Sequence, residues 1–205
     1  MLGITGYGMF VASSVMLNIT PGSDIIYVLS RASVGGRKVG IVSAFGICTG
    51  ILIHTALVAL GLSAIMASST VLFNTMKILG ALYLAIMGVK TIFSKSTMFD
   101  IKGDKVESMG AVFRQGVLTN ALNPKVALFF LSLMPQFVLA DNPYGPVPFL
   151  ILGLTFFTTS IIWCIFLAYI ASFASRFLNK NPKVSMIANK VAGIIYIILG
   201  LNVLR

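Results

Sequence analysis

The stretch Asn18-Ile19-Thr20-Pro21-Gly22-Ser23-Asp24 ends an apolar run, residues 1–23, that contains no Asp, Glu, Lys or Arg. Proline in a spanning helix removes a hydrogen-bond donor and frees a carbonyl that lipid cannot satisfy. Thr20 is a good N-cap residue, and Pro21 suits the first position of a new helix. The stretch therefore predicts a helix that breaks and restarts within the membrane, with Asp24 one turn after the break.

A second proline break lies in the other half of the chain, where Asn123-Pro124 precedes Lys125. Asn123, like Thr20, is a good N-cap residue, so each proline can open a half-helix. The first turn of a helix has unpaired N–H groups and about half a positive charge, which attracts carboxylates. The two breaks predict a carboxylate site, with a pair of purely structural kinks as the alternative.

Two ionised residues lie close to these breaks, Asp24 after the first and Lys125 directly after the second. An ionised group near the bilayer centre costs at least about 2.5–3.5 kcal/mol. One hypothesis is a zwitterion site, in which Lys125 and the helix ends take a carboxylate and Asp24 takes an ammonium or a coupling proton. The alternative is a buried ion pair that fixes the fold.

His54, the only histidine, is either a proton relay or bonded to a neighbouring helix.

The composition excludes a water-soluble globule. Of the 205 residues, 58% are hydrophobic and 10% are Asp, Glu, Lys or Arg, and the mean hydropathy is +0.99, whereas soluble domains are about 25% charged. Such a chain has too few polar groups to cover a water-facing surface. Apolar runs divided at loop signals predict an all-α polytopic membrane protein with six transmembrane helices. The expected spans are 5–30, 40–66, 71–93, 110–139, 147–174 and 185–204.

Lys and Arg residues are distributed unequally between the expected loops. Twelve of them follow the first, third and fifth spans, whereas Lys77 and Arg205 fall on the other side. Because cytoplasmic loops carry the excess of basic residues, both termini are predicted to face the outside. The net charge of +10 is therefore interpreted as a topology signal. The uncharged N-terminal segment lacks the basic region of a secretory signal, which predicts that it is retained as a helix.

A short motif recurs between the two halves of the chain. Lys77-x-x-Gly80-x-x-Tyr83 in the third expected span returns as Lys190-x-x-Gly193-x-x-Tyr196 in the sixth. With the two proline breaks, this match predicts two repeats of three spans. A repeat with an odd number of spans inserts its second copy upside down, as in many secondary transporters. We expect one transmembrane domain over 1–205, with repeat one at about 1–95, a cytoplasmic connector at about 95–109, and repeat two at about 110–205.

Four stretches together point to a known family. They are Asn18-x-Thr20-Pro21-Gly22-Ser23-Asp24, Gly46-x-x-x-Gly50 with His54-Thr55, Lys77-x-x-Gly80-Ala81-x-Tyr83-Leu84, and Phe113-x-x-Gly116-x-x-Thr119-Asn120-x-x-Asn123-Pro124-Lys125. In this order they resemble the lysine exporter and homoserine/threonine efflux (LysE/RhtB-type) family, and the resemblance extends through the whole chain. Members usually have proline where this chain has Ser23, a departure that loosens the start of the half-helix but keeps the break.

The resemblance implies a secondary active exporter of amino acids in the bacterial inner membrane, driven by proton antiport and needing no cofactor. Homoserine, threonine, leucine-like and basic amino acids are the substrates it suggests. A neutral zwitterion is favoured because Asp24 is the one acidic residue deep in the membrane. The implied partners are the substrate, the coupling proton and membrane lipid; a homodimer stays open, and nucleic acid is excluded. The candidate substrate and coupling residues are Asp24, Lys125, Thr20, Pro21, Gly22, Asn120, Asn123, Pro124 and His54.

Other functional classes find less support in the sequence. An intramembrane aspartyl protease needs two buried aspartates, and only Asp24 qualifies. A serine–histidine enzyme would need a serine activated by His54, but the sequence has no Gly-x-Ser-x-Gly elbow. Cys48 and Cys164 show no metal-ligand spacing. Neither catalytic residues nor a metal site is therefore predicted, and an enzyme is not expected. An ion channel or a membrane assembly subunit of the same broken-helix design is the alternative function.

Overall fold

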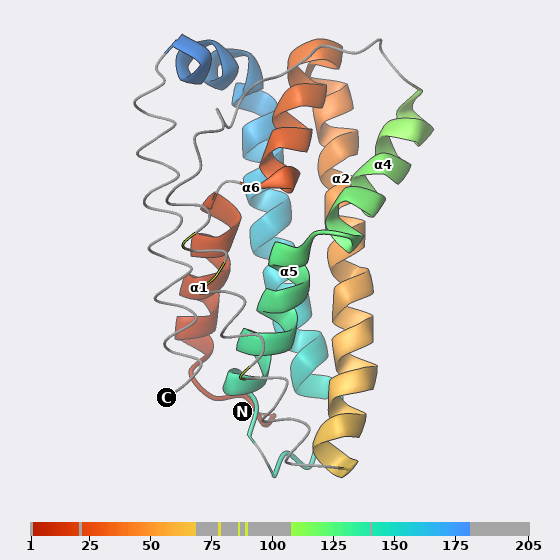
Figure 1. The fold of residues 1–205 in the computed structure, drawn as a ribbon, viewed down its shortest axis with the longest axis vertical. Helices are drawn as coiled ribbons and strands as arrows, with labels where there is room; N and C mark the ends of the chain where they lie inside the picture. The colour runs from red at the N-terminus through yellow and green to blue at the C-terminus, as the bar shows by residue number, and fades with distance from the viewer. Residues whose placement is uncertain are drawn as a thin grey trace.

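The computed structural model describes residues 2–20, 22–68, 108–139 and 141–180, together with positions 78, 86 and 89. Within these ranges the chain is helical, with one isolated bridge between Ile4 and Val138 and no strand. The predicted all-α class is confirmed. The elements, labelled in Figure 1 where there is room, are α1 (Tyr7–Ile19), α2 (Ser23–Ser68), α4 (Met109–Ala121), α5 (Pro124–Leu128), the π-helix η1 (Phe129–Leu133), the 3-10 helix η2 (Met134–Phe137) and α6 (Val147–Lys180).

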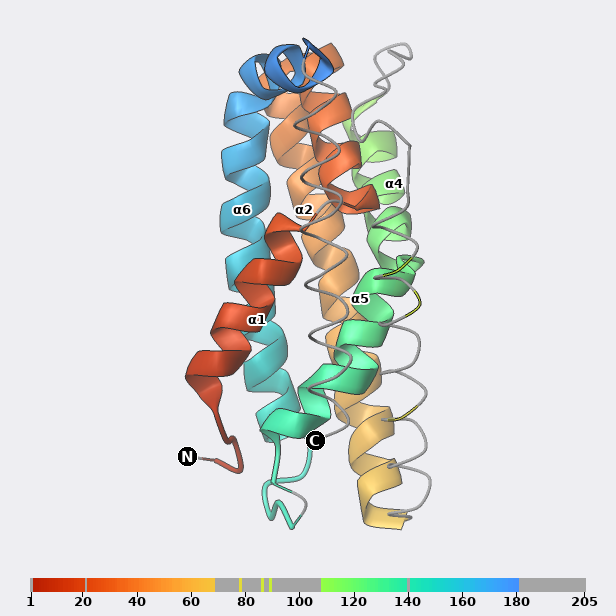
Figure 2. The ribbon, with the colours of Figure 1, turned by 60° about the vertical axis from the view of Figure 1, so that its left-hand side comes forward.

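The described helices are long and apolar enough for a membrane. Ser23–Gly61 and Val147–Ala171 each have the length and hydropathy of a span, and the bent pair Met109–Ala121 with Pro124–Phe137 adds a third if it is counted as one. Figures 1 and 2 show α2 and α6 running along the long axis of the molecule, and α2 packs against both α6 and α4. These features confirm a helical membrane protein.

The first predicted span is broken at Thr20. This residue directly follows α1 and has extended backbone angles, φ −64° and ψ 125°. Its amide and its hydroxyl both donate to the carbonyl of Met16, at 3.0 and 2.7 Å, and these bonds close the last turn of α1. The chain becomes helical again at Ser23, which places Asp24 in the first turn of α2. Pro21, predicted to open this helix, lies outside the described residues.

The chain turns within α2 at Gly36. This residue has φ 77° and ψ −176°, a conformation that residues with a side chain rarely adopt. Figure 1 shows the two arms of α2 lying side by side. A Cβ atom on Gly40 would lie 3.3 Å from the Cα atom of Ala32, so the arms approach closely just beyond the turn. The turn falls in the loop predicted between the first two spans. The loop is much shorter than predicted, because Gly36 alone leaves the helical conformation and helix continues on both sides of it.

The fourth predicted span is broken between α4 and α5, which are bent by 44°. The Ser108 hydroxyl accepts from the amide of Ala111 at 3.3 Å and caps the start of α4. Asn123 caps α5, because its Oδ1 accepts from the amide of Lys125 at 3.0 Å. Pro124 takes the first helical position, where its missing N–H is not needed. The predicted half-helix that begins with proline is therefore present.

The apolar core consists of two clusters that occupy successive lengths of the bundle. The first is aromatic and includes five fully buried rings, those of Phe10, Phe129, Phe130, Phe149 and Phe156. The second is aliphatic and packs the first arm of α2 against the far part of α6. Its members are Ile25, Val28, Leu29, Ala32, Ala44, Ile47, Cys164, Leu167, Ala168 and Ala171. Along α6 the buried members of the clusters cover residues 149–156 and 164–171, and Thr159 and Ser160, which lie between them, make polar contacts with Asn18.

The predicted third and sixth spans, 71–93 and 185–204, lie outside the described residues, apart from helical positions 78, 86 and 89. The recurring Lys-Gly-Tyr motif falls in these two segments. The six-span count, the inverted repeat and the domain boundaries therefore stay predictions.

Replacing Gly116 by alanine should destabilise the protein. A Cβ atom at this position would lie 3.1 Å from the Cα atom of Gly46 and 3.1 Å from the carbonyl oxygen of Ser43, where α4 packs on α2. Backbone atoms yield little, so we expect a loss of about 1–3 kcal/mol. Gly61→Ala in α2 is the control, because nothing lies within 4 Å of its added Cβ. Melting in detergent checks the prediction, and equal melting temperatures for the two variants would contradict the close contact.

Candidate functional site

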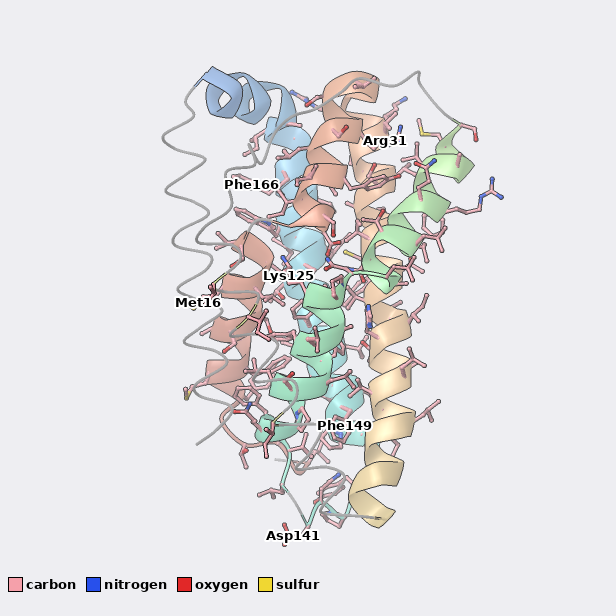
Figure 3. The ribbon with its side chains drawn as sticks, in the orientation of Figure 1. Met16, Arg31, Lys125, Asp141, Phe149 and Phe166 are labelled. Carbon is pink, nitrogen blue, oxygen red and sulfur yellow. The ribbon has the colours of Figure 1, made fainter. Side chains whose placement is uncertain are left out.

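The two helix breaks meet at the middle of the molecule. The Nζ atom of Lys125, from the second break, donates to the carbonyl oxygens of Leu17 at 3.2 Å and Thr20 at 2.9 Å, both at the first break. A Cβ atom on Gly22 would lie 3.1 Å from the same Nζ. Figure 3 shows Lys125 between Arg31, near one end of the molecule, and Asp141 at the other end, and nearer to Arg31. The ammonium of Lys125 thus binds the C-terminal end of α1.

Asp24 is held by the second break in return. Its carboxylate accepts from Nδ2 of Asn120 at 2.8 Å and from Nδ2 of Asn123 at 2.9 Å, and the Ser23 hydroxyl is 3.5 Å away. Asp24 is 9% exposed and Lys125 is 5% exposed. Among the described residues, no hydrogen bond joins these two side chains. The opposite charges share one site, as expected, but amides and helix carbonyls replace the direct ion pair.

Helix electrostatics explain this arrangement. Asp24 is in the first turn of α2, where the unpaired N–H groups favour a negative charge. The ammonium of Lys125 reaches the last turn of α1, where the unpaired carbonyls favour a positive charge. Each ion therefore stabilises a helix end that lipid could not satisfy.

Asn123 joins the Asp24 carboxylate to the backbone at the start of α5 through opposite ends of one amide. Its Oδ1 accepts from the backbone N–H of Lys125, and its Nδ2 donates to the Asp24 carboxylate. The amide is buried, with 4% of the residue exposed. An ionised aspartate at this position would keep the helix cap but lose the donor to Asp24. The residue that sequence reasoning identified as an N-cap is therefore also a ligand of the carboxylate.

His54 contacts the charged site through Asn120, which also binds the Asp24 carboxylate. Its Nε2 donates to the carbonyl oxygen of Asn120 at 3.0 Å, and its ring lies 5.8 Å from that of Phe130. The structure therefore gives His54 a bond to a neighbouring helix rather than a contact with Asp24. The Oδ1 atom of Asn120 is buried and has no hydrogen-bond partner within the described ranges. A Cβ on Gly50 would lie 2.7 Å from this oxygen, so glycine lets Asn120 approach α2.

A cavity of about 360 Å³ with mixed polar and apolar walls lies beside the site, on the side of Arg31. Its walls include Ser23, which contacts Asp24, and Thr119, which precedes Asn120. The Arg31 guanidinium donates to Gln115 at 2.6 Å and lies 5.5 Å from the Tyr27 ring centre.

Asn18 was quoted in the sequence motif but not selected as a site residue. Its Nδ2 donates to the Thr159 hydroxyl at 3.1 Å, and its Oδ1 accepts from the Ser160 hydroxyl at 2.7 Å. These bonds fix the end of α1 to α6. A Thr-Ser pair inside an apolar span was the available signal, because such polar groups need partners in lipid. Within the described part of the chain, no three His, Cys, Asp or Glu residues are placed to hold a metal ion.

The sequence model of the LysE type translocator family matches residues 15–205. The chain belongs to this LysE family. The match includes both breaks and the residues that hold Asp24 and Lys125. The resemblance noted in the sequence is therefore confirmed.

Relatives of this LysE-family chain are similar over nearly their full length. The uncharacterized membrane protein YrhP of Bacillus subtilis (strain 168) is 33% identical over 202 residues, which cover 94% of this chain and 95% of the relative. The leucine efflux protein of Salmonella typhimurium is 27% identical over 199 residues, covering 95% and 92%. The leucine efflux protein of Klebsiella pneumoniae is 28% identical over 196 residues, with the same coverage. No solved structure matches the chain.

Asn123→Asp should destabilise this LysE-family protein because it sets a second acidic group against the buried Asp24 carboxylate. The lost donor and the crowded charges should lower stability by about 2–3 kcal/mol, while the cap of α5 is kept. The control is Asn142→Asp, the same change at an exposed turn where Nδ2 donates to the Gly145 carbonyl. Thermal melting in detergent measures both variants. Equal losses would mean that the Asn123–Asp24 bond contributes nothing specific.

Proposed function

We propose that this LysE-family chain is a secondary exporter of amino acids, with the meeting point of the two helix breaks as the substrate and coupling site. One observation carries the proposal: Asp24 and Lys125 lie buried together, each held by the opposite break. An amino acid carries the same two charged groups in one small molecule. Two of its relatives are named leucine efflux proteins, which supports an amino acid as the substrate.

The contacts of Asp24 and Lys125 suggest how a zwitterion binds. The Lys125 ammonium occupies carbonyl groups that could equally accept from a substrate ammonium, and the Asp24 carboxylate occupies amide donors that could serve a substrate carboxylate. A zwitterion would exchange these contacts, so that its carboxylate pairs with Lys125 and its ammonium with Asp24. Without substrate, Asp24 and Lys125 pair with the polar groups of the site. A bound zwitterion takes over these pairings and leaves the net charge of the site unchanged.

A neutral amino acid fits this site better than a basic one. Of the acidic residues that the structure describes, Asp24 is buried and Asp141 lies in an exposed turn. A lysine or arginine substrate would bring a second positive group to a site with one buried carboxylate. The cavity beside Ser23 is proposed as the approach from the Arg31 end, which the distribution of Lys and Arg predicts to be cytoplasmic.

Proton antiport would use the same carboxylate. Asp24 holds either a proton or the substrate ammonium, so binding of one excludes the other, which is the requirement for exchange. His54 binds the carbonyl of Asn120, whose side chain binds Asp24, and is proposed as a secondary proton relay.

A channel or an assembly subunit is the competing function. Counterflow of labelled amino acids in sealed liposomes separates them, because a scaffold exchanges no solute and a channel gives no transient accumulation against a gradient.

Asp24→Asn should strongly reduce proton-driven export while the protein stays folded in the membrane. The variant keeps the volume of the side chain but removes the charge that binds an ammonium or a proton. Loss of one charge-assisted hydrogen bond predicts a fall in transport of about 10–100-fold. Asp141→Asn is the control, because it removes the same charge at an exposed position. Uptake into liposomes with and without an imposed pH gradient measures both variants after their melting curves are compared.

Proton-dependent export at the wild-type rate in a well-folded Asp24→Asn protein would remove Asp24 from the mechanism. A parallel loss in Asp24→Asn and Asp141→Asn would indicate a general charge effect instead of a site.

Both termini are proposed to lie on the outer face of the bacterial inner membrane, as the excess of Lys and Arg after odd-numbered spans predicts. A phosphatase fused after Arg205 should be active, and a fluorescent protein that folds only in the cytoplasm should stay dark there. The same reporters fused after Lys102, in the predicted cytoplasmic connector, should give the opposite result. An inactive phosphatase fusion together with a fluorescent fusion that is bright at Arg205 would overturn the six-span topology with both termini outside.

A further inference from the structure

Asn120 and Asn123 both bind the Asp24 carboxylate, but they use their amides differently. Nδ2 of Asn120 donates to Oδ2 of Asp24 at 2.8 Å, and Nδ2 of Asn123 donates to the other carboxylate oxygen, Oδ1, at 2.9 Å. The amide oxygen of Asn123 also accepts from the backbone N–H of Lys125, so two bonds fix its orientation. The amide oxygen of Asn120 is buried and has no hydrogen-bond partner among the described residues. The amide of Asn120 can therefore reverse without losing a bond at its second end, and that of Asn123 cannot.

The space around Asn120 accepts a reversed amide. The residue is fully buried, and its amide oxygen would lie 2.7 Å from a Cβ atom on Gly50, so the amide packs directly against α2. A rotation by 180° about the Cβ–Cγ bond exchanges the oxygen with an NH₂ group of nearly the same size. The end that faces Gly50 is unpaired before the rotation, and so the reversal breaks no hydrogen bond there.

Protonation of Asp24 decides which orientation of this amide is stable. An ionised carboxylate only accepts hydrogen bonds, so both asparagines must present their N–H groups to it, as they do. A proton turns one carboxylate oxygen into a donor. The oxygen that Asn123 binds must keep accepting, because this amide cannot reverse without losing the cap of α5. The proton therefore belongs on Oδ2, where it would face the N–H group of Asn120 unless that amide reverses.

We propose that Asn120 is a positioning residue of proton coupling, which donates to ionised Asp24 and reverses its side-chain amide to accept from the protonated acid. The proposal rests on the proposed export function, in which Asp24 carries the coupling proton. When the proton binds Oδ2, an N–H···O bond from Asn120 becomes an O–H···O bond to Asn120, and the bond from Asn123 is kept. Both oxygens of Asp24 thus stay hydrogen-bonded in either protonation state.

The other titratable groups around Asp24 come from three helices. They are Lys125 of α5, Cys48 and His54 of α2, and Cys164 of α6. Within the described ranges, none of them makes a hydrogen bond to the Asp24 carboxylate, and His54 binds the backbone carbonyl of Asn120 rather than its side chain. The last turn of α1 contains no titratable residue, and Arg31, two turns along α2, binds Gln115. These groups leave the bonding of a proton on Asp24 to its polar neighbours.

The Ser23 hydroxyl is the competing acceptor for this proton. It lies 3.5 Å from Oδ1 of Asp24, which is the oxygen that Asn123 binds. A proton directed to Ser23 would have to sit on that oxygen, and the hydroxyl oxygen of a carboxylic acid accepts more weakly than its carbonyl oxygen. The bond from Asn123 would then be weakened. Asn120 is favoured because its reversal leaves this bond intact.

Infrared difference spectra of the full chain in liposomes test the reversal directly. Lowering the pH should produce the C=O band of a protonated carboxylic acid that the Asp24→Asn variant lacks. In protein labelled with ¹³C-asparagine, the same step should lower the C=O stretching frequency of one side-chain amide, because its oxygen changes from unpaired to hydrogen-bonded. The amide signal should be absent from Asp24→Asn and Asn120→Leu and should persist in Ser23→Ala.

Transport of labelled leucine, used as the probe, tests the consequence for coupling. Counterflow requires the carrier to cross with substrate bound, whereas uptake driven by an imposed pH gradient also requires the protonated carrier. Asn120→Leu keeps a side chain branched at Cγ and leaves the Asn123 donor for ionised Asp24, but it offers protonated Asp24 no acceptor. The ratio of proton-driven uptake to counterflow should fall about tenfold.

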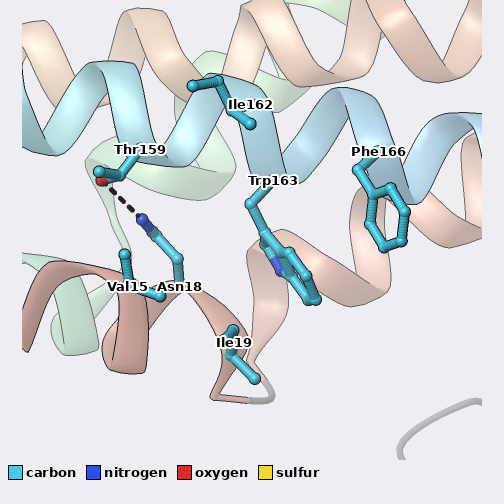
Figure 4. A pocket seen from close by; sticks show the side chains of 7 residues that line it. All are labelled: Val15, Asn18, Ile19, Thr159, Ile162, Trp163 and Phe166. Carbon is cyan, nitrogen blue, oxygen red and sulfur yellow. Dashed lines mark hydrogen bonds between the residues drawn. The ribbon is translucent and has the colours of Figure 1, made fainter. Parts of the chain in front are cut away.

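Asn18→Leu is the matched control for this ratio. Figure 4 shows the Asn18 amide bonded to Thr159, and its oxygen accepts from Ser160, so both ends of this amide are paired away from Asp24. Loss of these structural bonds should lower both kinds of transport together and leave the ratio at the wild-type value. If Asn120→Leu does not fold, Asn120→Val and Asn18→Val are compared in the same assays.

The outcomes separate this inference from the function beneath it. An acid band from Asp24 without a change in any asparagine band would overturn the role of Asn120 and keep proton coupling by Asp24. An asparagine signal that survives in Asn120→Leu or disappears in Ser23→Ala would also overturn this role, as would equal transport ratios in Asn120→Leu and Asn18→Leu. Absence of an acid band from Asp24 over the pH range of transport would overturn the proposed coupling and the inference together.

Discussion

Two buried ions of opposite sign, each satisfied by a broken end of the other half of the chain, set the architecture of this protein. Asp24 follows the first break and is bound by amides of the second, and Lys125 follows the second break and binds carbonyls of the first. Either ion alone would be costly in the membrane, and an unpaired helix end would be costly in lipid. The two breaks must therefore come together for either of them to be stable.

Close helix packing follows from this requirement. Asn120 approaches Asp24 only because Gly50 leaves room for its amide, and α4 lies against α2 where Gly46 faces Gly116. Larger residues at these glycines would separate the helices and lengthen the hydrogen bonds that hold the carboxylate. Asn18 fixes α1 to α6 through its bonds to the hydroxyls of Thr159 and Ser160. These bonds hold the end of α1 that binds Lys125. Small residues and polar pairs thus hold the charged site in position.

Sequence reasoning predicted the class of the fold and the places of both breaks, because proline interrupts a helix within a few residues. The predicted N-cap role is confirmed for Asn123 but was wrong for Thr20, which ends α1 and donates its hydroxyl to the Met16 carbonyl, while α2 begins at Ser23. It also selected Asp24, Lys125, Asn120 and Asn123, which the structure brings together. It did not predict that Asn123 would join Asp24 to the start of α5, or that Lys125 would bind backbone carbonyls. Backbone groups carry no sequence signal, and the identity of a residue does not tell which of several nearby acceptors it reaches. The repeat motif in the third and sixth spans lies outside the described residues, so the inverted symmetry still rests on sequence.

The net charge of the site gives a physical reason for the proposed coupling of transport to protons. With Asp24 ionised, its charge and that of Lys125 sum to zero, and a bound zwitterion leaves the sum unchanged. Protonation of Asp24 leaves the site with one positive charge, and moving that charge across the membrane is worth about 2.3 kcal/mol per 100 mV. A carrier that moves outward neutral with its substrate and inward protonated would be driven in one direction by the membrane potential, negative inside. The same pair of residues that makes the break stable would then also make the cycle directional, which explains why an exporter would retain two costly ions where a single polar residue could have capped either helix.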